Sequence, residues 1–132
     1  MSTRRTLLSL ALALLIGMCL ALSSCLGSPT VPIPPPEPTR MVFNVDTTGG
    51  TAVFTYDADS SYSNAVVYVF NRDKGVGVIT TAEADGSVAP TDPFAGDAGD
   101  NVVVTFELDS QLGSTCVVLQ QGRSSAANEC SQ

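Results

Sequence analysis

From residue 41 onward, the chain consists of short apolar or β-branched runs separated by turn residues, and this pattern constrains the fold class most strongly. In residues 51–56 the apolar Ala52, Phe54 and Tyr56 alternate with Thr51, Val53 and Thr55, residues 65–71 are the most apolar run, and no window has sustained helical periodicity. The predicted strands are residues 41–46, 51–56, 65–71, 76–81, 101–108 and 115–120. Runs at this spacing predict an all-β fold, an antiparallel β-sandwich of about six or seven strands.

A proline-rich segment precedes the strands, because residues 28–39 read SPTVPIPPPEPT and hold six of the eight prolines in the chain. Proline lacks a backbone N–H and has a fixed φ, so this segment is not expected to form a helix or a central strand. We expect extended polyproline II geometry, in which twelve residues at about 3.1 Å each span roughly 35 Å. A ligand for a proline-binding groove is the alternative to this spacer.

The charge of the chain is distributed unevenly, and it excludes some classes of partner. The residues after Cys25 include four basic and thirteen acidic residues, which gives a formal charge of −9. An acidic surface repels phosphate backbones, so nucleic acid is not expected as a partner. The sequence has no histidine, the commonest general base and metal ligand, on which serine and cysteine nucleophiles usually depend. We therefore expect neither an enzyme nor a cofactor.

The first 24 residues have the layout of an export signal peptide. Arg4 and Arg5 form a short basic start, and residues 7–22 are apolar except for Ser9 and Gly17. This apolar run is slightly short for a membrane-spanning helix, which needs about 20 residues. No basic stop-transfer cluster follows it. Residues 1–24 are therefore predicted to be a signal peptide that is removed after export.

The apolar run ends in the sequence LSSC, residues 22–25, which resembles the lipobox of bacterial lipoproteins. The resemblance implies transfer of diacylglycerol to the Cys25 sulfur, cleavage between Ser24 and Cys25, and acylation of the new amino terminus, commonly with palmitate. Cys19 fits less well because the bulky Met18 precedes it and apolar residues follow it. Secretion with a nearby cut and an uncleaved helical anchor are the alternatives.

Lipid on Cys25 implies an exported protein of the cell envelope whose partner is a lipid bilayer. One acyl chain gives marginal attachment, at about 0.8 kcal/mol per buried CH₂, whereas two or three chains hold a protein on the membrane. Leu26 follows the cysteine, where enterobacterial-type sorting uses aspartate for inner-membrane retention, so the outer membrane is favoured if the organism has one. The predicted organisation is then a signal peptide (1–24), a lipidated cysteine with a proline-rich tether (25–39), a β-sandwich (40–123) and a C-terminal tail (124–132).

The order of the β runs between Ser63 and Leu119 resembles that of bacterial immunoglobulin-like domains, which are found in exported and surface proteins. The segments that carry the resemblance are AVVYVFN (65–71), VGVITTA (76–82), ADGS (84–87), two Gly-Asp pairs directly before NVVV (101–104), and GSTCVV (113–118). The resemblance implies an immunoglobulin-like sandwich used for display and binding, but it assigns no ligand. Residues 89–93 depart from the pattern as an apparent insertion.

Two cysteines, Cys116 and Cys130, remain in the exported part once Cys25 is lipidated. Thiols commonly pair in an oxidising compartment, so we expect a disulfide between them. It would pin the tail onto the last strand, and a closed loop of about 15 residues contributes roughly 3 kcal/mol in the chain-entropy model. The alternative is a buried Cys116 and a free Cys130.

Other candidate contact residues lie in predicted loops. Tyr62 lies in a polar segment, residues 57–63, and is the candidate for contact with a partner. Asp57 with Asp59, and Asp97 with Asp100, could offer oxygen ligands to calcium, but neither pair matches the twelve-residue calcium-loop pattern. Solvated turn aspartates are the favoured interpretation, and no metal site is predicted.

These features together predict a membrane-anchored lipoprotein that presents a non-catalytic immunoglobulin-like domain as a structural or interaction module. The expected partner besides the bilayer is an unknown envelope protein or glycan. A carbohydrate- or calcium-binding surface module is the alternative, although the chain has no tryptophan to stack on a sugar.

Overall fold

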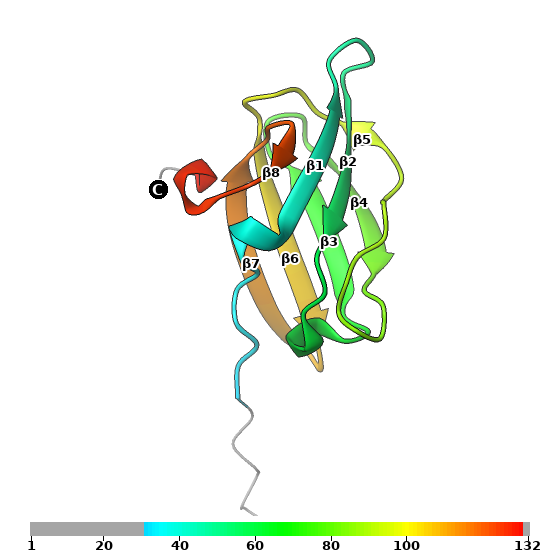
Figure 1. Ribbon diagram of the computed structural model, residues 1–132, viewed down its shortest axis with the longest axis vertical. Helices are drawn as coiled ribbons and strands as arrows, with labels where there is room; N and C mark the ends of the chain where they lie inside the picture. Colours follow the sequence, from blue (N-terminus) through cyan, green and yellow to red (C-terminus); the bar gives the residue numbers. More distant parts are fainter. Residues whose placement is uncertain (1–30, 131–132) are drawn as a thin grey trace, which may run out of the picture. The chain divides into compact units, whose positions relative to one another are not determined.

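The computed structural model describes residues 31–130, and those from Pro32 onward belong to one compact unit. This unit is a sandwich of two four-stranded antiparallel sheets, one in front of the other in Figure 1. The strand orders are β5-β2-β1-β8 and β4-β3-β6-β7. The prediction of an all-β antiparallel sandwich is therefore confirmed.

The described residues contain eight strands and three short 3-10 helices. The strands are β1 (Met41–Asp46), β2 (Thr51–Tyr56), β3 (Val66–Asn71), β4 (Val76–Thr81), β5 (Phe94–Ala95), β6 (Asn101–Leu108), β7 (Gln111–Val118) and β8 (Gly122–Arg123). The 3-10 helices are η2 (Pro38–Arg40), η3 (Ser60–Tyr62) and η4 (Ala126–Asn128). Between residues 31 and 130, no helix is both long and apolar enough to cross a membrane.

The core forms where alternate side chains of the two sheets meet, as the period of two in the sequence requires. Its largest fully buried side chains include Phe43, Phe54, Val67, Val69, Val102, Val104, Phe106 and Val117. Burial of each such side chain stabilises the fold by about 1.5–3 kcal/mol. Aromatic rings join the sheets, because the Tyr56 ring of β2 lies 5.0 Å, centroid to centroid, from the Phe106 ring of β6.

The hairpin between β6 and β7 differs from the prediction. Strand β7 was expected to begin at Thr115, because Gly113 and Ser114 are typical turn residues. The turn instead consists of Asp109 and Ser110, with φ of 50° and 65°, the pair of left-handed residues that a two-residue type I′ hairpin requires. Strand β7 therefore starts four residues earlier and pairs with β6 along its whole length.

The second half of the proline-rich segment packs on the domain. Side chains of η3, β2 and β7 provide its hydrogen-bond partners, and Pro36 is buried. The bonds, donor first, are Ile33 N to Gln111 Oε1 at 2.9 Å, Tyr62 Oη to Pro34 O at 2.8 Å, Thr115 Oγ1 to Pro36 O at 2.6 Å, and Glu37 N to Tyr56 Oη at 3.1 Å. Residues 33–37, which were expected to be part of a free spacer, thus belong to the domain.

Candidate functional site

The predicted lipid site, Cys25, lies outside the described residues, as does the whole predicted signal peptide. The structure therefore shows the part of the chain that a lipid on Cys25 would anchor. Three features of this part bear on function: the disulfide with its neighbouring groove, the charged groups of the loops, and the outer face of the β4-β3-β6-β7 sheet.

A disulfide joins Cys116 of β7 to Cys130, with the two Cα atoms 5.3 Å apart. The predicted pairing is thus confirmed. The Cys130 N–H donates to the Cys116 carbonyl oxygen at 3.0 Å, and Glu129 forms an antiparallel bridge with Val117. The C-terminal segment consequently folds back along the free side of β7 and covers part of that edge, as expected from a covalent staple.

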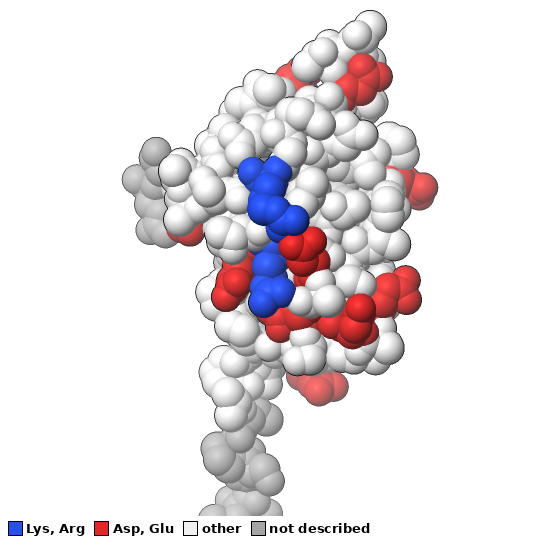
Figure 2. All heavy atoms as spheres, viewed as in Figure 1, with Lys and Arg blue, Asp and Glu red and all other residues white. Residues whose placement is uncertain are grey.

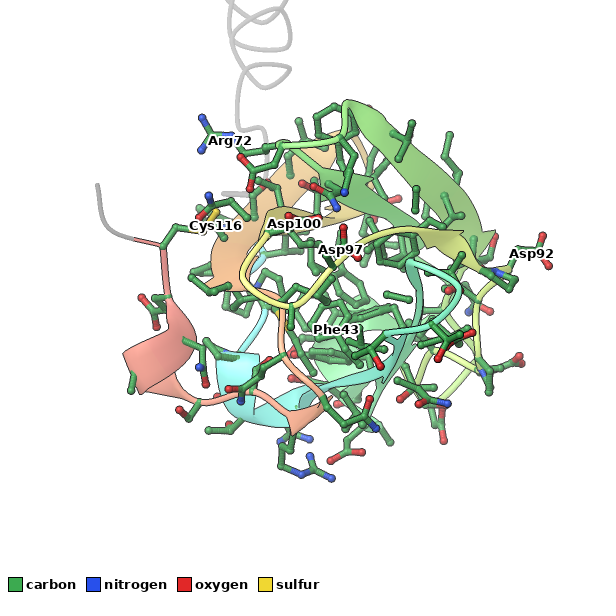
Figure 3. All side chains as sticks on the ribbon, turned by 90° about the horizontal axis from the view of Figure 1, so that it is seen from above. Phe43, Arg72, Asp92, Asp97, Asp100 and Cys116 are labelled. Atoms are coloured by element: carbon green, nitrogen blue, oxygen red, sulfur yellow. A yellow bond between two sulfur atoms is a disulfide. The ribbon has the colours of Figure 1, made fainter. Side chains whose placement is uncertain are left out.

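A groove of about 510 Å³ lies between the proline-rich segment, β7 and the disulfide-bonded segment. Its charged lining residues are Glu37, Arg72 and Glu129, and Figure 3 shows Arg72 and Cys116 on the same side of the domain. The hydroxyl of Ser114, which also lines the groove, is hydrogen-bonded to Thr105 at 2.8 Å. The groups that the groove offers to a ligand are therefore hydroxyls and charged side chains.

Tyr62 does not form a contact surface, so the prediction for this residue is wrong. It is 1% exposed, and its ring centroid lies 4.3 Å from that of Phe106. The expected polar loop contains η3, where the Asp59 side chain accepts from the Ser61 N–H at 3.0 Å and so caps the short helix. The cap fixes a turn that directs Tyr62 inward, and burial raises the pKa of its hydroxyl above the ordinary value.

A buried polar residue, Asn71, connects the loops at one end of the sandwich. Its Nδ2 donates to the Ala95 carbonyl at 3.1 Å and to Asp100 Oδ2 at 2.8 Å. Its Oδ1 accepts from the N–H groups of Asp73 at 3.0 Å and Lys74 at 3.2 Å. All hydrogen-bonding groups of this amide are therefore satisfied. The sequence offered a signal that was missed, since Asn71 is a lone polar residue at the end of the most apolar run.

The acidic pair Asp97 and Asp100, labelled on one loop in Figure 3, holds that loop in place. Asp100 accepts from the Asp97 N–H at 2.9 Å, and the Asp97 carboxylate pairs with Lys74. Burial opposes ionisation of Asp100, but the hydrogen bonds from the Asp97 N–H and the Asn71 amide, with the Lys74 charge, outweigh it and lower the pKa of Asp100. These carboxylates thus have structural partners rather than being solvated turn residues only.

Most basic side chains of the domain are neutralised by neighbouring acids. Arg123 pairs with Asp57, and Arg40 pairs with Glu37 at 3.2 Å and with Asp59 at 3.7 Å. Figure 2 shows basic atoms in one stripe with acidic atoms against them. Across residues 31–130, no group of three or more potential ligands is placed to hold a metal ion. The acids that remain unpaired with a base leave the domain surface negative.

The outer face of the β4-β3-β6-β7 sheet carries exposed apolar side chains that were not predicted. Ile79 is 70% exposed, Leu112 65% and Phe70 45%. A shallow hollow of about 230 Å³ lies between β3 and β4, beside Gly77. The sequence does contain a signal, because residues 66–70 and 76–79 carry no polar side chain that would mark a solvent-facing side, apart from the tyrosine hydroxyl. That pattern is typical of a strand buried on both faces, which these strands are not.

Comparisons of the chain with protein-family models, with curated protein sequences and with solved structures gave no match.

Proposed function

We propose that this chain is a lipid-anchored protein of a bacterial cell envelope, whose β-sandwich is a non-catalytic structural or interaction module. The observation that carries the proposal is the sequence LSSC at residues 22–25, directly after a basic start and an apolar run. That order of features is what signal recognition and cleavage at a lipidated cysteine require. Lipid on Cys25 would place the domain outside the cytoplasm, on a membrane surface.

The disulfide between Cys116 and Cys130 supports export. Structural disulfides persist in oxidising compartments and are rare in the reducing cytosol. A small domain also gains most from such a staple, because it buries only a moderate core. Both arguments fit a domain that functions outside the cell or in the periplasm.

The strand order supports an immunoglobulin-like module. In the second sheet, the β3-β4 and β6-β7 hairpins lie side by side in the order β4-β3-β6-β7. The corresponding sheet of an immunoglobulin variable-type sandwich combines strands C′, C, F and G. Such sandwiches serve display and binding in many proteins, although the fold alone assigns no ligand.

The packed proline segment shortens the proposed tether. With residues 33–37 held on the domain, seven residues (26–32) separate Cys25 from the packed part of the chain. A fully extended chain rises at most about 3.6 Å per residue, so the eight steps from Cys25 to Ile33 reach no more than roughly 29 Å. The domain would therefore stay close to the headgroup region instead of standing some 35 Å away.

The calcium-binding alternative has less support than the interaction module. Asp57 and Asp97 are already paired with Arg123 and Lys74, and Asp100 accepts two hydrogen bonds. A cation would have to displace these partners before it could gain the six to eight oxygen ligands that calcium prefers.

The anchor is tested by Cys25→Ser in the full chain, with Cys19→Ser as the matched control. Cells are fed a fatty-acid analogue, and label on the protein is measured together with its processing. We expect Cys25→Ser to lose the label and to accumulate as precursor, while Cys19→Ser is labelled and processed like the wild type. Equal label on Cys25→Ser and wild type would refute the proposal, and loss of label in Cys19→Ser alone would move the anchor to that residue.

A further inference from the structure

Strand β4 is a sheet edge that no strand pairs with, although β5 of the other sheet lies near it, whereas the other three edges of the sandwich are short or covered. Strands β5 and β8 have two residues each, and the disulfide-bonded segment lies along β7. Strand β4 has six residues, VGVITT, with no charge and no proline. Natural sheets usually blunt long edges with charged side chains, proline, bulges or a covering segment, because a bare edge pairs with other strands. Within the described part of the chain, β4 is therefore the edge that is open to pairing.

Three residues of β4 present their backbone groups to the outside. The Ala82 N–H donates to the Ala65 carbonyl at 2.8 Å, so these two residues form a hydrogen-bonded pair with β3. In an antiparallel ladder such pairs alternate with residues whose N–H and C=O point away from the partner strand. By this alternation the backbone N–H and C=O groups of Gly77, Ile79 and Thr81 point away from β3, toward the open side of the strand. No backbone bond outside the β3 ladder satisfies them within residues 31–130.

We propose that β4 pairs antiparallel with β4 of a second copy of this chain, about a twofold axis through Ile79. The three outward residues are spaced symmetrically around Ile79. This register therefore pairs Ile79 with Ile79 of the second copy, and Gly77 with Thr81 of the second copy. All outward N–H and C=O groups of the three residues then gain partners at once. The interface is self-complementary, as a twofold symmetric contact requires.

The side chains of the outer face suit this pairing. Ile79, 70% exposed on each copy, would lie opposite Ile79 of the second copy. Cross-strand apolar pairs of this kind stabilise a sheet by about 0.2–1 kcal/mol each. At Gly77 a Cβ would lie 2.3 Å from the Val69 carbonyl oxygen. Glycine there avoids a clash with the β3 backbone, and Thr81 of the second copy lies opposite it.

The charge distribution favours β4 over the rest of the surface for contact between two copies. Two domains of charge −9 repel each other, and the repulsion is least where no charged side chain lies in the contact. Strand β4 follows Lys74 and precedes Glu83. The charged residues that flank the strand, Asp73 and Lys74 before it and Glu83 and Asp85 after it, lie outside the three paired positions.

The register is tested by single cysteine substitutions in the full chain, exported to an oxidising compartment. Paired residues in this position have Cα atoms about 5.5 Å apart, which lies within the range for a disulfide. Ile79→Cys should therefore shift the protein from monomer to a disulfide-linked dimer on a non-reducing gel. Thr81→Cys is the register control, because the two copies of residue 81 would be four residues, or about 13 Å, apart along the strand. Leu112→Cys is the control for exposure, since Leu112 is 65% exposed on β7.

We expect Ile79→Cys alone to give the dimer, with Cys116–Cys130 intact by disulfide mapping. A monomeric Ile79→Cys protein would overturn the proposal. Equal amounts of dimer from all three cysteine variants would also overturn it, because they would show that the dimers form by random collision. A crosslink from the introduced thiol to a different protein would also overturn it, because another partner would then occupy the edge.

A second measurement adds no cysteine and therefore cannot disturb the native disulfide. Sedimentation of the full chain in a mild detergent should show two copies for the wild type and for Leu112→Lys, and one copy for Ile79→Lys. A wild-type monomer, or dimers of Ile79→Lys, would overturn the proposal without reference to the lipid anchor.

Discussion

Replacement of Asn71 tests whether its buried amide holds the loops at one end of the sandwich. Asn71→Ala removes two partly buried hydrogen bonds, to Ala95 and Asp100, and two to the turn that precedes β4. All four hydrogen bonds are partly buried, so water replaces the lost amide only in part. A buried polar group left without its partner costs about 1–3 kcal/mol. We therefore expect a loss of about 1–3 kcal/mol in the free energy of unfolding.

The pH dependence of this loss of stability tests whether Asp100 is the hydrogen-bond partner responsible for it. Because the pKa of Asp100 is lowered in the folded state, its ionised form stabilises the fold above the pKa of an unfolded aspartate, about 3.9. That contribution is lost as the pH falls through the lower folded value. Asn71→Ala removes one of the groups that lower this pKa. The difference in stability between wild type and variant should therefore narrow as the pH falls below about 4.

The assay is urea unfolding of residues 32–132 with the disulfide intact, and Asn44→Ala is the control. Asn44 lies on β1 and is exposed, so its removal should change the free energy of unfolding by no more than about 0.5 kcal/mol. If Asn71→Ala is no more destabilising than Asn44→Ala at neutral pH, the amide does not hold these loops. If the difference between wild type and Asn71→Ala does not narrow in acid, Asp100 is not the partner that matters.

Other substitutions test the packing of the segments that flank the sandwich. Gly113→Ala should lower stability by about 1–3 kcal/mol, because a Cβ there lies 2.4 Å from the Pro34 carbonyl oxygen. The same clash should speed amide hydrogen exchange in the segment that precedes β1, and unchanged exchange would contradict this. Tyr62→Phe should cost about 0.5–1.5 kcal/mol, the value of one hydrogen bond, and a neutral effect would mean that the bond to Pro34 contributes nothing. Cys130→Ser should lower stability by about 3 kcal/mol at most and loosen the tail, and loss of the whole fold would refute a stapling role. Millimolar calcium should leave the Tm of the domain unchanged relative to magnesium, whereas a calcium-specific rise would favour a metal site.

The sequence predicts the strands with clear alternation and misses features that depend on distant contacts. Strands β1, β2, β4 and β6 have the expected bounds because each combines β-branched or aromatic residues with a period of two and ends at turn residues. The start of β7 was missed because Gly113 looks like a turn residue, although its role is to leave room for the Pro34 carbonyl. Strands of two residues such as β5 carry no periodic signal.

The candidate contact residues show the same limit. Tyr62 was expected to be exposed because its neighbours in sequence are polar. Its packing partner, Phe106 of β6, is distant in sequence, so the local pattern does not reveal the contact. The exposure of Ile79 was not predicted, because no sequence pattern reveals that β4 is an edge, and the order of strands depends on which hairpins lie side by side. The disulfide was predicted correctly because Cys116 and Cys130 are the two cysteines that follow the proposed lipid site, Cys25.

The proline-rich segment packs on the domain in a way that composition alone does not suggest. Proline has no N–H to donate, so residues 33–37 cannot join β7 as a strand. Their carbonyl oxygens still accept hydrogen bonds, and Tyr62 and Thr115 supply them. Proline also loses little backbone freedom on packing, because its φ is already fixed in the unfolded chain. If Cys25 carries the proposed lipid, a pull from the membrane would therefore act first on these side-chain bonds to Tyr62 and Thr115, and on β1 only after their loss.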